Sequence, residues 1–246
     1  DGKKAGERSL ACENAESTHP IRKASLLAIV AAVGVRERTL LQLDISNMCI
    51  NKGGATSMAS AVRNCFGLKY FNIADNAIGS VGANAIFQSL RRVLTLEELY
   101  VDCNGIGDSA AHAMSTFIGE SKCLRILSLS ENELSNDGAS MIWSGIAKND
   151  EIPLTSINFA GNKIDTAWCM STTFRTSRYL ESVNLSNNIL NQSSGRVFAD
   201  AILPEKWGAT RSLTSLDLGG NNLGVEGSSL IARALGQTDR LRLLWL

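Results

Sequence analysis

The stretch LTSLDLGGNNL, residues 213–223, decides the fold, because its pattern recurs along most of the chain. Read alone, an alternating apolar segment that runs into glycines looks like a strand followed by a phosphate-binding loop. Such a loop would occur once and would carry a lysine for the phosphate. This stretch contains no lysine, and its counterpart at residues 72–82 lacks most of the glycines. We therefore interpret the glycines and asparagines as the turn of a repeated unit.

The repeated phrase begins eight times, at successive spacings of 28, 28, 28, 30, 26, 33 and 28 residues. Its first residue is always leucine, and its fourth and sixth residues are apolar. The leucines are Leu40, Leu68, Leu96, Leu124, Leu154, Leu180, Leu213 and Leu241. The ninth residue is asparagine in six consecutive units, at Asn76, Asn104, Asn132, Asn162, Asn188 and Asn221. Self-similarity at this period indicates a stack of coils in which each unit packs on its neighbours.

Each unit reads as a short strand, a turn and a helix. Apolar residues at positions 1, 4 and 6 face the core of such a coil, whereas positions 3, 5 and 7 face outward. Asparagine suits the buried turn because its amide both donates and accepts hydrogen bonds, so it can form a ladder along the stack. Apolar pairs one helical turn apart, such as Met114 and Ile118, indicate a helix in the second half. Glycine before the helix, as at Gly82, permits close packing.

The phrase LxxLxLxxNxL with a helical half and a 28-residue period resembles the leucine-rich repeat of the ribonuclease-inhibitor type. The resemblance covers residues 40–246. It implies a curved α/β solenoid, or horseshoe, with a parallel β-sheet on the concave face and helices on the convex face. Geometry gives the same bend, since strands about 4.8 Å apart must share a stack with helices about 8–10 Å apart.

Three regions make up the predicted organisation: a flexible tail at residues 1–19, a capping helix at residues 20–39 and the repeat domain at residues 40–246. Pro20 suits a first helical position, and the apolar residues after it would cover the open end of the first coil. The repeat domain holds about seven full units and the start of an eighth. Because the last phrase stops at Leu246 without a polar cap, we expect further repeats or a capping segment after it.

The first unit has Met48 where asparagine is expected, as fits a terminal coil, and two further units depart from the pattern. The fifth is short, has Trp168 where other units have glycine, and places Thr172 on the inner column of its helix, so we expect a distorted helix there. The sixth carries an insert at residues 203–212. Within it, Trp207 either is exposed for a partner or packs locally, and we favour local packing.

Composition argues against several classes of protein. The 24 acidic and 24 basic residues balance, so nothing attracts the whole chain to nucleic acid or an anionic membrane. The longest apolar run, residues 26–35, is too short to cross a bilayer. Six scattered cysteines lack metal-site or disulfide-framework spacing, so we expect reduced, mostly buried thiols in an intracellular protein. The two histidines lie far from any cysteine cluster, and we predict no metal or cofactor.

Catalytic motifs are also missing from the sequence. No serine or cysteine lies in a nucleophile motif, and the acidic residues are spread one per unit rather than paired. We therefore predict a non-enzymatic protein.

The concave face is the predicted binding surface. Positions 2, 3, 5, 7 and 8 of the phrases line or rim it with eight acidic and three basic residues, a net of five negative charges on a neutral chain. These charges either attract a basic partner or only keep the sheet soluble. Tyrosine among carboxylates is a typical anchor for a basic or amphipathic segment. The predicted partner-binding residues are Tyr70, Asn72, Asp75, Glu98, Tyr100, Asp102, Ile126 and Glu131.

These observations favour a protein–protein interaction scaffold in the cytoplasm. The first alternative is an architectural subunit of a large cytoskeletal, axonemal or organellar assembly, which would use the insert and the convex helices. A second alternative, regulation of a small GTPase or innate sensing, follows only from the family resemblance. An expected partner is a protein with a basic or amphipathic segment, and neither nucleic acid nor a membrane is expected.

Overall fold

A computed structural model describes residues 28–33, 35, 38–203 and 212–246. Strands and helices alternate along these residues. The strands are β1 (Gln42–Asp44), β2 (Tyr70–Asn72), β3 (Glu98–Tyr100), β4 (Ile126–Ser128), β5 (Ser156–Asn158), β6 (Ser182–Asn184), β7 (Ser215–Asp217) and β8 (Leu243–Trp245). The helices are α3 (Lys52–Val62), α4 (Gly79–Leu90), α5 (Ala111–Glu120), α6 (Asn136–Lys148), α7 (Ser171–Thr176), α8 (Ser194–Ile202) and α9 (Gly224–Leu235), with 3-10 turns η1 (Asp108–Ala110) and η2 (Trp168–Met170).

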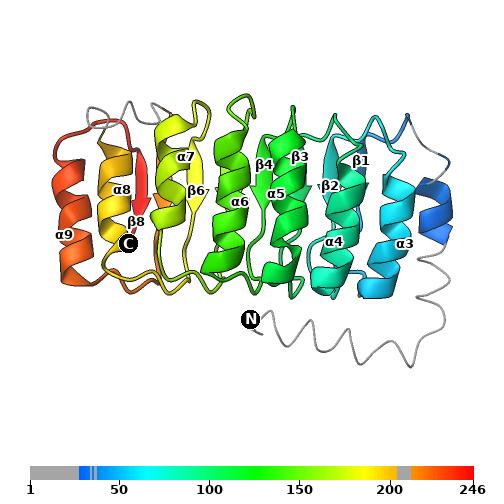
Figure 1. Ribbon diagram of the computed structural model, residues 1–246, viewed down its shortest axis with the longest axis horizontal. Helices are drawn as coiled ribbons and strands as arrows, with labels where there is room; N and C mark the ends of the chain where they lie inside the picture. The colour runs from blue at the N-terminus through cyan, green and yellow to red at the C-terminus, as the bar shows by residue number, and fades with distance from the viewer. Residues whose placement is uncertain (1–27, 34, 36–37, 204–211) are drawn as a thin grey trace.

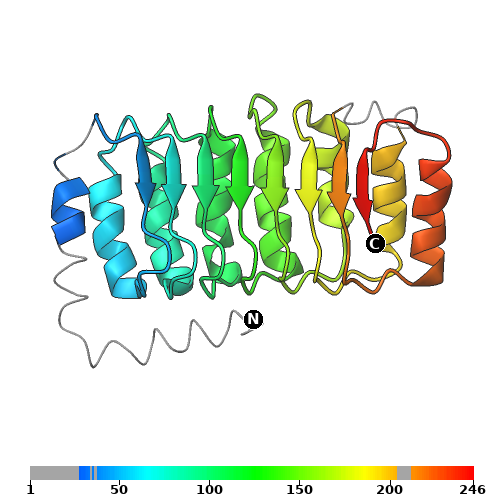
Figure 2. The same cartoon turned by 180° about the vertical axis from the view of Figure 1, so that it is seen from behind.

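The strands form one parallel sheet in the order β1 to β8, so neighbours in the sequence are neighbours in space (Figure 2). Equivalent residues of successive units pair across the sheet, as Leu43 does with Phe71 and Phe71 with Leu99. The helices stand side by side in front of the sheet (Figure 1). The predicted curved α/β solenoid is confirmed.

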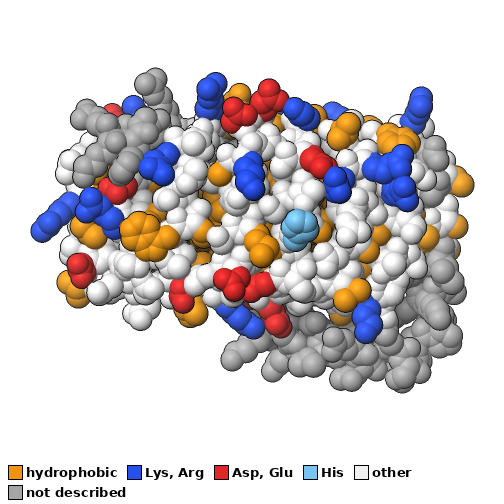
Figure 3. Space-filling model, in the orientation of Figure 1, with side chains coloured by type: hydrophobic (Ala, Val, Ile, Leu, Met, Phe, Trp, Pro, Cys, Tyr) orange, Lys and Arg blue, Asp and Glu red, His pale blue; other side chains and the backbone are white. Residues whose placement is uncertain are grey.

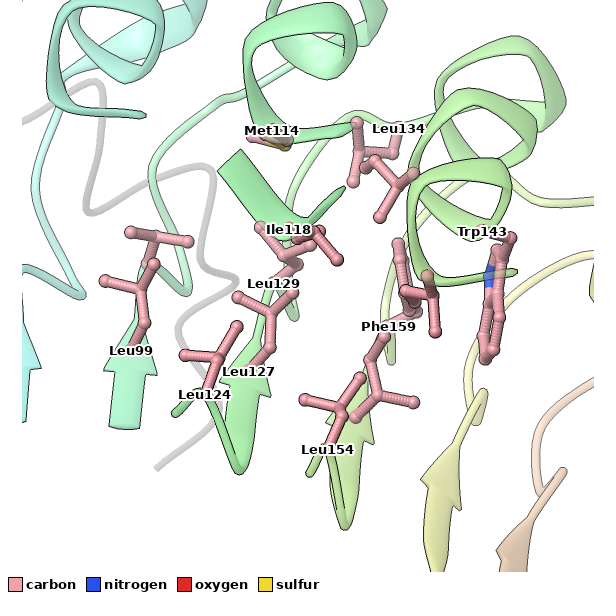
Figure 4. Close-up of a cluster of buried hydrophobic side chains, with 14 of the residues drawn as sticks. Leu99, Met114, Ile118, Leu124, Leu127, Leu129, Leu134, Trp143, Leu154 and Phe159 are labelled. Carbon is pink, nitrogen blue, oxygen red and sulfur yellow. The ribbon is translucent and has the colours of Figure 1, made fainter. Parts of the chain in front are cut away.

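The core lies between the sheet and the row of helices. Figure 4 shows Leu99 and Leu127 reaching from neighbouring strands toward the helical layer, with Met114 and Ile118 of α5 above them. All four side chains are fully buried. Close contact between coils requires glycine at the start of a helix, since a Cβ added to Gly82 would lie 2.7 Å from the Cβ of Ala55 in the preceding coil. The inward columns predicted from the repeat are thus the core of the protein.

The asparagine ladder connects the first seven coils to one another. Asn132, which is 6% exposed, is its clearest rung. The Asn132 Oδ1 accepts hydrogen bonds from the backbone N–H groups of Asn104 and Ile106 in the preceding coil, at 3.1 and 3.0 Å. Its Nδ2 donates to the carbonyl of Val101 in that coil and to those of Leu129 and Ser130 in its own. These bonds satisfy backbone groups that the buried turn would otherwise leave unpaired.

The fifth unit has the distorted helix that the sequence predicted. Its helical half consists of the turn η2 and the six residues of α7, whereas α6 has 13. The expected inner position was wrong by one residue: Thr172 is exposed, and the buried threonine is Thr173, whose hydroxyl donates to the Trp143 carbonyl at 3.3 Å. The 3-10 turn before α7 advances the chain by about 3.0 residues per turn instead of 3.6, which shifts the helical register.

The ends and the insert are described only in part. Residues 28–33 are helical, and Val33 is buried against the first coil, with Ile29 and Val30 packed beside it. The predicted tail and the beginning of the capping helix at Pro20 lie outside the described residues, and so does Trp207. The three-part organisation of the chain stays a prediction.

The sequence predicted that all the cysteines are reduced, and the structure differs from this at one residue. Cys49 is disulfide-bonded, so that expectation is wrong at this residue. Sequence spacing misses such a bond because it records only separation along the chain and not the path of the fold. Cys103, Cys123 and Cys169 carry free thiols. Burial raises the pKa of the Cys169 thiol to about 11, so it stays protonated at neutral pH.

We predict that Asn132→Ala lowers the free energy of unfolding by about 3 kcal/mol, because it leaves several buried backbone groups without a partner. Asn84→Ala is the matched control, since Asn84 is half-buried on α4 and its side chain donates to the Ser109 carbonyl at 3.2 Å. It should cost less than about 1 kcal/mol. Urea denaturation monitored by circular dichroism measures both, and equal losses in the two variants would contradict a structural role for the ladder.

Candidate functional site

Two columns of side chains cross the concave face, because every strand contributes one residue at position 3 and one at position 5. The register of the sheet places their members side by side. The position 3 column is Gln42, Tyr70, Glu98, Ile126, Ser156, Ser182, Ser215 and Leu243. The position 5 column is Asp44, Asn72, Tyr100, Ser128, Asn158, Asn184, Asp217 and Trp245. The large outward side chains of this part of the sheet are Tyr70, Glu98, Tyr100 and Ile126 on β2 to β4, whereas small polar residues occupy both columns on β5 to β7.

Tyr70, Glu98 and Tyr100 form one cluster on strands β2 and β3. The two phenol rings are tilted by 43° with their centroids 5.5 Å apart, a distance typical of favourable aromatic pairs. The Tyr100 hydroxyl donates to the Glu98 carboxylate at 2.9 Å. Burial, followed by the bond to Glu98, raises the pKa of Tyr100 to about 12. Ile126 pairs with Glu98 across the sheet and adds an apolar, partly exposed side chain beside this cluster.

Position 5 also has a structural use that the sequence analysis missed. Where it is Asp or Asn, the side-chain oxygen accepts a hydrogen bond from the backbone N–H two residues later, which closes a turn at the end of the strand. The five pairs are Asp44 with Ser46, Asn72 with Ala74, Asn158 with Ala160, Asn184 with Ser186, and Asp217 with Gly219. This backbone bond is the main cause that lowers the pKa of Asp44. The recurrence of Asp or Asn at this position was the available signal.

Tyr100 and Ser128 interrupt these turns in the third and fourth units. There Asp102 acts from position 7 of the preceding coil: its Oδ1 accepts from the Ser130 backbone N–H at 2.6 Å and from the Ser128 hydroxyl at 2.5 Å. Asp102 therefore replaces the missing turn residue of the next coil. Tyrosine occupies a place where five other units keep a turn-forming Asp or Asn, and nothing in the repeat requires an aromatic ring there.

Position 8 has a left-handed backbone in seven successive units, which the sequence analysis also missed. The residues are Asn47, Asp75, Cys103, Glu131, Gly161, Asn187 and Gly220, with φ between 51° and 70°. Glycine, asparagine and aspartate tolerate this conformation, whereas it is strained for cysteine and glutamate. The strained pair therefore falls in the third and fourth units, beside the tyrosine cluster. Burial, followed by the charge of Asp75, raises the pKa of the Cys103 thiol to about 12.

The structure thus divides the eight predicted site residues into three groups. Tyr70, Glu98, Tyr100 and Ile126 are neighbours on the open sheet. Asn72 and Asp102 serve turns, and Asn72 also donates from Nδ2 to Asp44 at 3.1 Å. Asp75 and Glu131 stand at the rim on left-handed residues. The acidic surface is accordingly less available than its count of charges suggests, and Glu97 is further paired with Lys69 at 2.8 Å.

Neither a metal centre nor a membrane span accompanies this face within the part of the chain that the structure describes. No group of three or more His, Cys, Asp or Glu side chains is arranged there to hold a metal ion. Among the same residues, no helix has the length and apolar character needed to cross a membrane.

Comparison with known proteins places this architecture in a family. A model of the leucine-rich repeat family matches residues 64–87, 94–115, 120–142 and 210–232. The fold is similar to that of an internalin from Listeria monocytogenes, with a TM-score of 0.55 and 16% sequence identity. The match covers 88% of this chain and 50% of the internalin, so the chain spans about half the length of that protein. No curated protein matches the sequence. The chain is a leucine-rich repeat protein, a class whose extended concave surfaces generally mediate protein–protein interaction.

We predict that Tyr100 ionises near pH 12, well above its ordinary pKa of 10.0. Because the folded protein then holds the phenol proton more tightly than the unfolded chain, this stabilising contribution is present below pH 10 and is lost as the pH rises toward 12. Glu98→Gln should lower the pKa of Tyr100 only part of the way to its ordinary value, since burial is a larger cause of the raised pKa than the bond to Glu98. Absorbance of tyrosinate measures the titration, and subtraction of the Tyr100→Phe curve assigns it. A measured Tyr100 pKa near its ordinary value of 10.0 would contradict the burial and the hydrogen bond to Glu98 that define the cluster.

We also predict that Glu131→Gly raises the free energy of unfolding by about 1 kcal/mol, because glycine adopts the left-handed backbone without strain. Gly161 and Gly220 already occupy the same position in other units. Glu133→Gly is the control, since Glu133 lies two residues away and has no positive φ, and it should not stabilise. Urea denaturation compares the two, and a destabilising Glu131→Gly argues against strain at this position.

Proposed function

We propose that the protein is a non-enzymatic interaction scaffold that binds a partner protein on strands β2 to β4 of its concave face. One observation carries this proposal: Tyr100 stands where five other units have a turn-forming Asp or Asn, and its ring lies against that of Tyr70 on the neighbouring strand. Large aromatic side chains contribute most of the binding energy at many protein interfaces. A pair of them on neighbouring strands of an open, curved sheet is a suitable anchor.

The chemistry of the cluster supports a basic or amphipathic partner segment. Glu98, the Tyr100 hydroxyl and the rim carboxylate of Glu131 offer acceptors for lysine or arginine, and arginine can also stack on a tyrosine ring. Ile126 and the two rings offer apolar contact to the same segment. A partner with one long basic side chain between apolar ones matches this combination.

An intracellular location and an architectural role are further proposals. The free thiols of Cys103, Cys123 and Cys169 are typical of a reducing compartment, whereas the disulfide at Cys49 is typical of an oxidising one, so the proposed location rests on the three free thiols alone. A subunit of a cytoskeletal or organellar assembly would use the same solenoid but would make its contacts through the convex helices. The tyrosine cluster favours recognition on the concave face over this alternative.

We predict that the triple variant Tyr70→Ala, Tyr100→Ala and Glu98→Lys weakens binding of the partner by at least about 30-fold, since the loss of interface tyrosines costs about 2 kcal/mol or more. A photo-crosslinking amino acid at Ile126 should capture the partner in native cells, and calorimetry with the purified partner then gives the affinity of each variant. Circular dichroism and urea denaturation check that the solenoid remains folded.

Two controls make the result specific. Ser156→Ala with Ser182→Lys changes the same concave face on β5 and β6, and it should leave the affinity within about twofold. A crosslinker at Val225, which is 86% exposed on α9, reports on the convex face. A partner that binds the triple variant as tightly as the wild type, or that crosslinks only from Val225, would refute the assignment to the concave face and favour the architectural alternative.

A further inference from the structure

Two exposed apolar side chains lie at the edge of the solenoid where the helices end and the next strands begin. Phe66 follows α3 and Leu94 follows α4, and they are 38% and 59% exposed. Their segments are in contact, because the Thr95 hydroxyl donates to the carbonyls of Phe66 and Leu68, one repeat earlier, at 3.0 and 2.8 Å. Figure 3 shows this edge along its top, where apolar side chains above α3 and α4 have basic side chains beside them. Phe66 and Leu94 therefore belong to one surface.

Packing within the repeat does not require an apolar residue at this position, two residues before the leucine that begins each phrase. In the fourth unit the residue is Ile152, which is buried. Elsewhere in the described chain it is charged and exposed, as in Arg38, Lys122, Arg178 and Asp239. Among the described residues, Phe66 and Leu94 alone are both apolar and exposed at this position. The fold therefore does not account for them, whereas contact with another molecule would.

Arg63 and Arg92 lie at the same edge, after α3 and α4, and both are exposed. Neither makes an ion pair or a side-chain hydrogen bond within the described part of the chain. In the first three units, the described carboxylates of this edge are already paired, in Lys69–Glu97 at 2.8 Å and Arg91–Glu120 at 2.6 Å. Two unpaired positive charges therefore accompany the two apolar side chains. We call Arg63, Phe66, Arg92 and Leu94 the edge patch.

The ends of α3 and α4 attract cations by themselves, since the last backbone carbonyls of a helix carry a partial negative charge. This effect accounts for the positions of Arg63 and Arg92 but not for the exposure of Phe66 and Leu94. A ligand with acidic residues alone would leave the apolar pair in water, and a purely apolar ligand would leave the two arginines without a counter-ion. The edge patch therefore fits a ligand that is both acidic and apolar.

We propose that the edge patch binds a short extended segment of a partner protein, with apolar residues at i and i+2 and acidic residues on either side. Coils are about 4.8 Å apart at their strands and about 8–10 Å apart at their helices, and Phe66 and Leu94 lie between these two layers. Residues i and i+2 of an extended segment point the same way and are about 6.6 Å apart, which falls within this range. The carboxylates of the segment would pair with Arg63 and Arg92. This segment is opposite in charge to the one expected on the concave face.

The test measures binding of labelled synthetic peptides to the whole protein by fluorescence anisotropy, with peptides of about nine residues, about 30 Å when extended. The first peptide has leucines at i and i+2 between glutamates, the second has lysine in place of glutamate, and the third has serine in place of leucine. We expect the first to bind at least about tenfold more tightly than the others. Leu94→Glu places a charge where other units already carry one, and it should weaken binding of the first peptide at least about tenfold. Arg63→Gln with Arg92→Gln should reduce the preference for glutamate over lysine about three- to tenfold.

Two matched controls change the same kinds of side chain at α9. Val225→Glu alters a residue that is 86% exposed, and Arg233→Gln with Arg240→Gln removes two exposed arginines in and after that helix. Both should bind the first peptide like the wild type, and so should the triple variant of the concave face, which separates this proposal from the proposed function. Circular dichroism checks that each variant remains folded.

The proposal is overturned if the first peptide binds no better than the other two, if Leu94→Glu has no effect, or if a control variant loses binding. Vesicles that contain phosphatidylserine test a membrane as the occupant of the same surface. Binding of the protein to these vesicles without binding to the first peptide also overturns the proposal.

Discussion

This solenoid depends on one constraint: the backbone N–H and C=O groups in the buried turn of each coil need hydrogen-bond partners. One asparagine side chain per turn supplies them. Each coil must reverse direction inside the protein, where an unpaired backbone N–H or C=O costs about 1–3 kcal/mol. The amide of Asn104, for example, donates to carbonyls of Ile73 in the preceding coil and of Val101 and Asp102 in its own. Because the bonds connect adjacent coils, the rung also fixes the register in which the strands pair.

A ladder inside the coil leaves the outer face of the sheet free to vary. Leucines and asparagines meet the needs of packing and hydrogen bonding, so the residues at positions 3 and 5 are limited only by the strand and its turn. Strands β5 to β7 carry serine at position 3, with amide or acidic turn residues at position 5. Strands β2 and β3 carry Tyr70, Glu98 and Tyr100. The leucines and asparagines of the repeat do not require tyrosine on β2 and β3. The presence of tyrosines there, and of small polar residues on β5 to β7, is the physical reason to look for a binding site in the first half of the sheet.

The sequence predicted the features that repeat and missed those that depend on one conformation. Leucine spacing was sufficient for the sheet, the core and the rungs, since period and burial follow directly from the pattern. The left-handed backbone at Glu131 could not be predicted, because glutamate rarely adopts this conformation and its presence in a sequence does not indicate it. The buried threonine was placed at Thr172 instead of Thr173, because a 3-10 turn breaks the helical count. For the candidate site, the neighbourhood of Tyr70 and Tyr100 followed from the period, whereas the engagement of Asp102 in a turn required side-chain geometry.

The fifth unit shows that the two halves of a coil are separable. Its helix is short, yet its rung remains: Asn162 accepts from the Leu134 N–H at 3.0 Å and donates to the Leu129 carbonyl of the preceding coil. Strands β5 and β6 accordingly pair in the same register as their neighbours.

Large aromatic side chains occupy the core behind the short helix. Trp143 stacks on Phe159 with centroids 5.7 Å apart, and Phe174 contacts both Trp143 and Phe198. The interior is therefore filled although the helix in front of it is short. A coil that keeps its rung and its core can lose helix on the convex side without disturbing the concave sheet, so the two faces of the solenoid can vary independently.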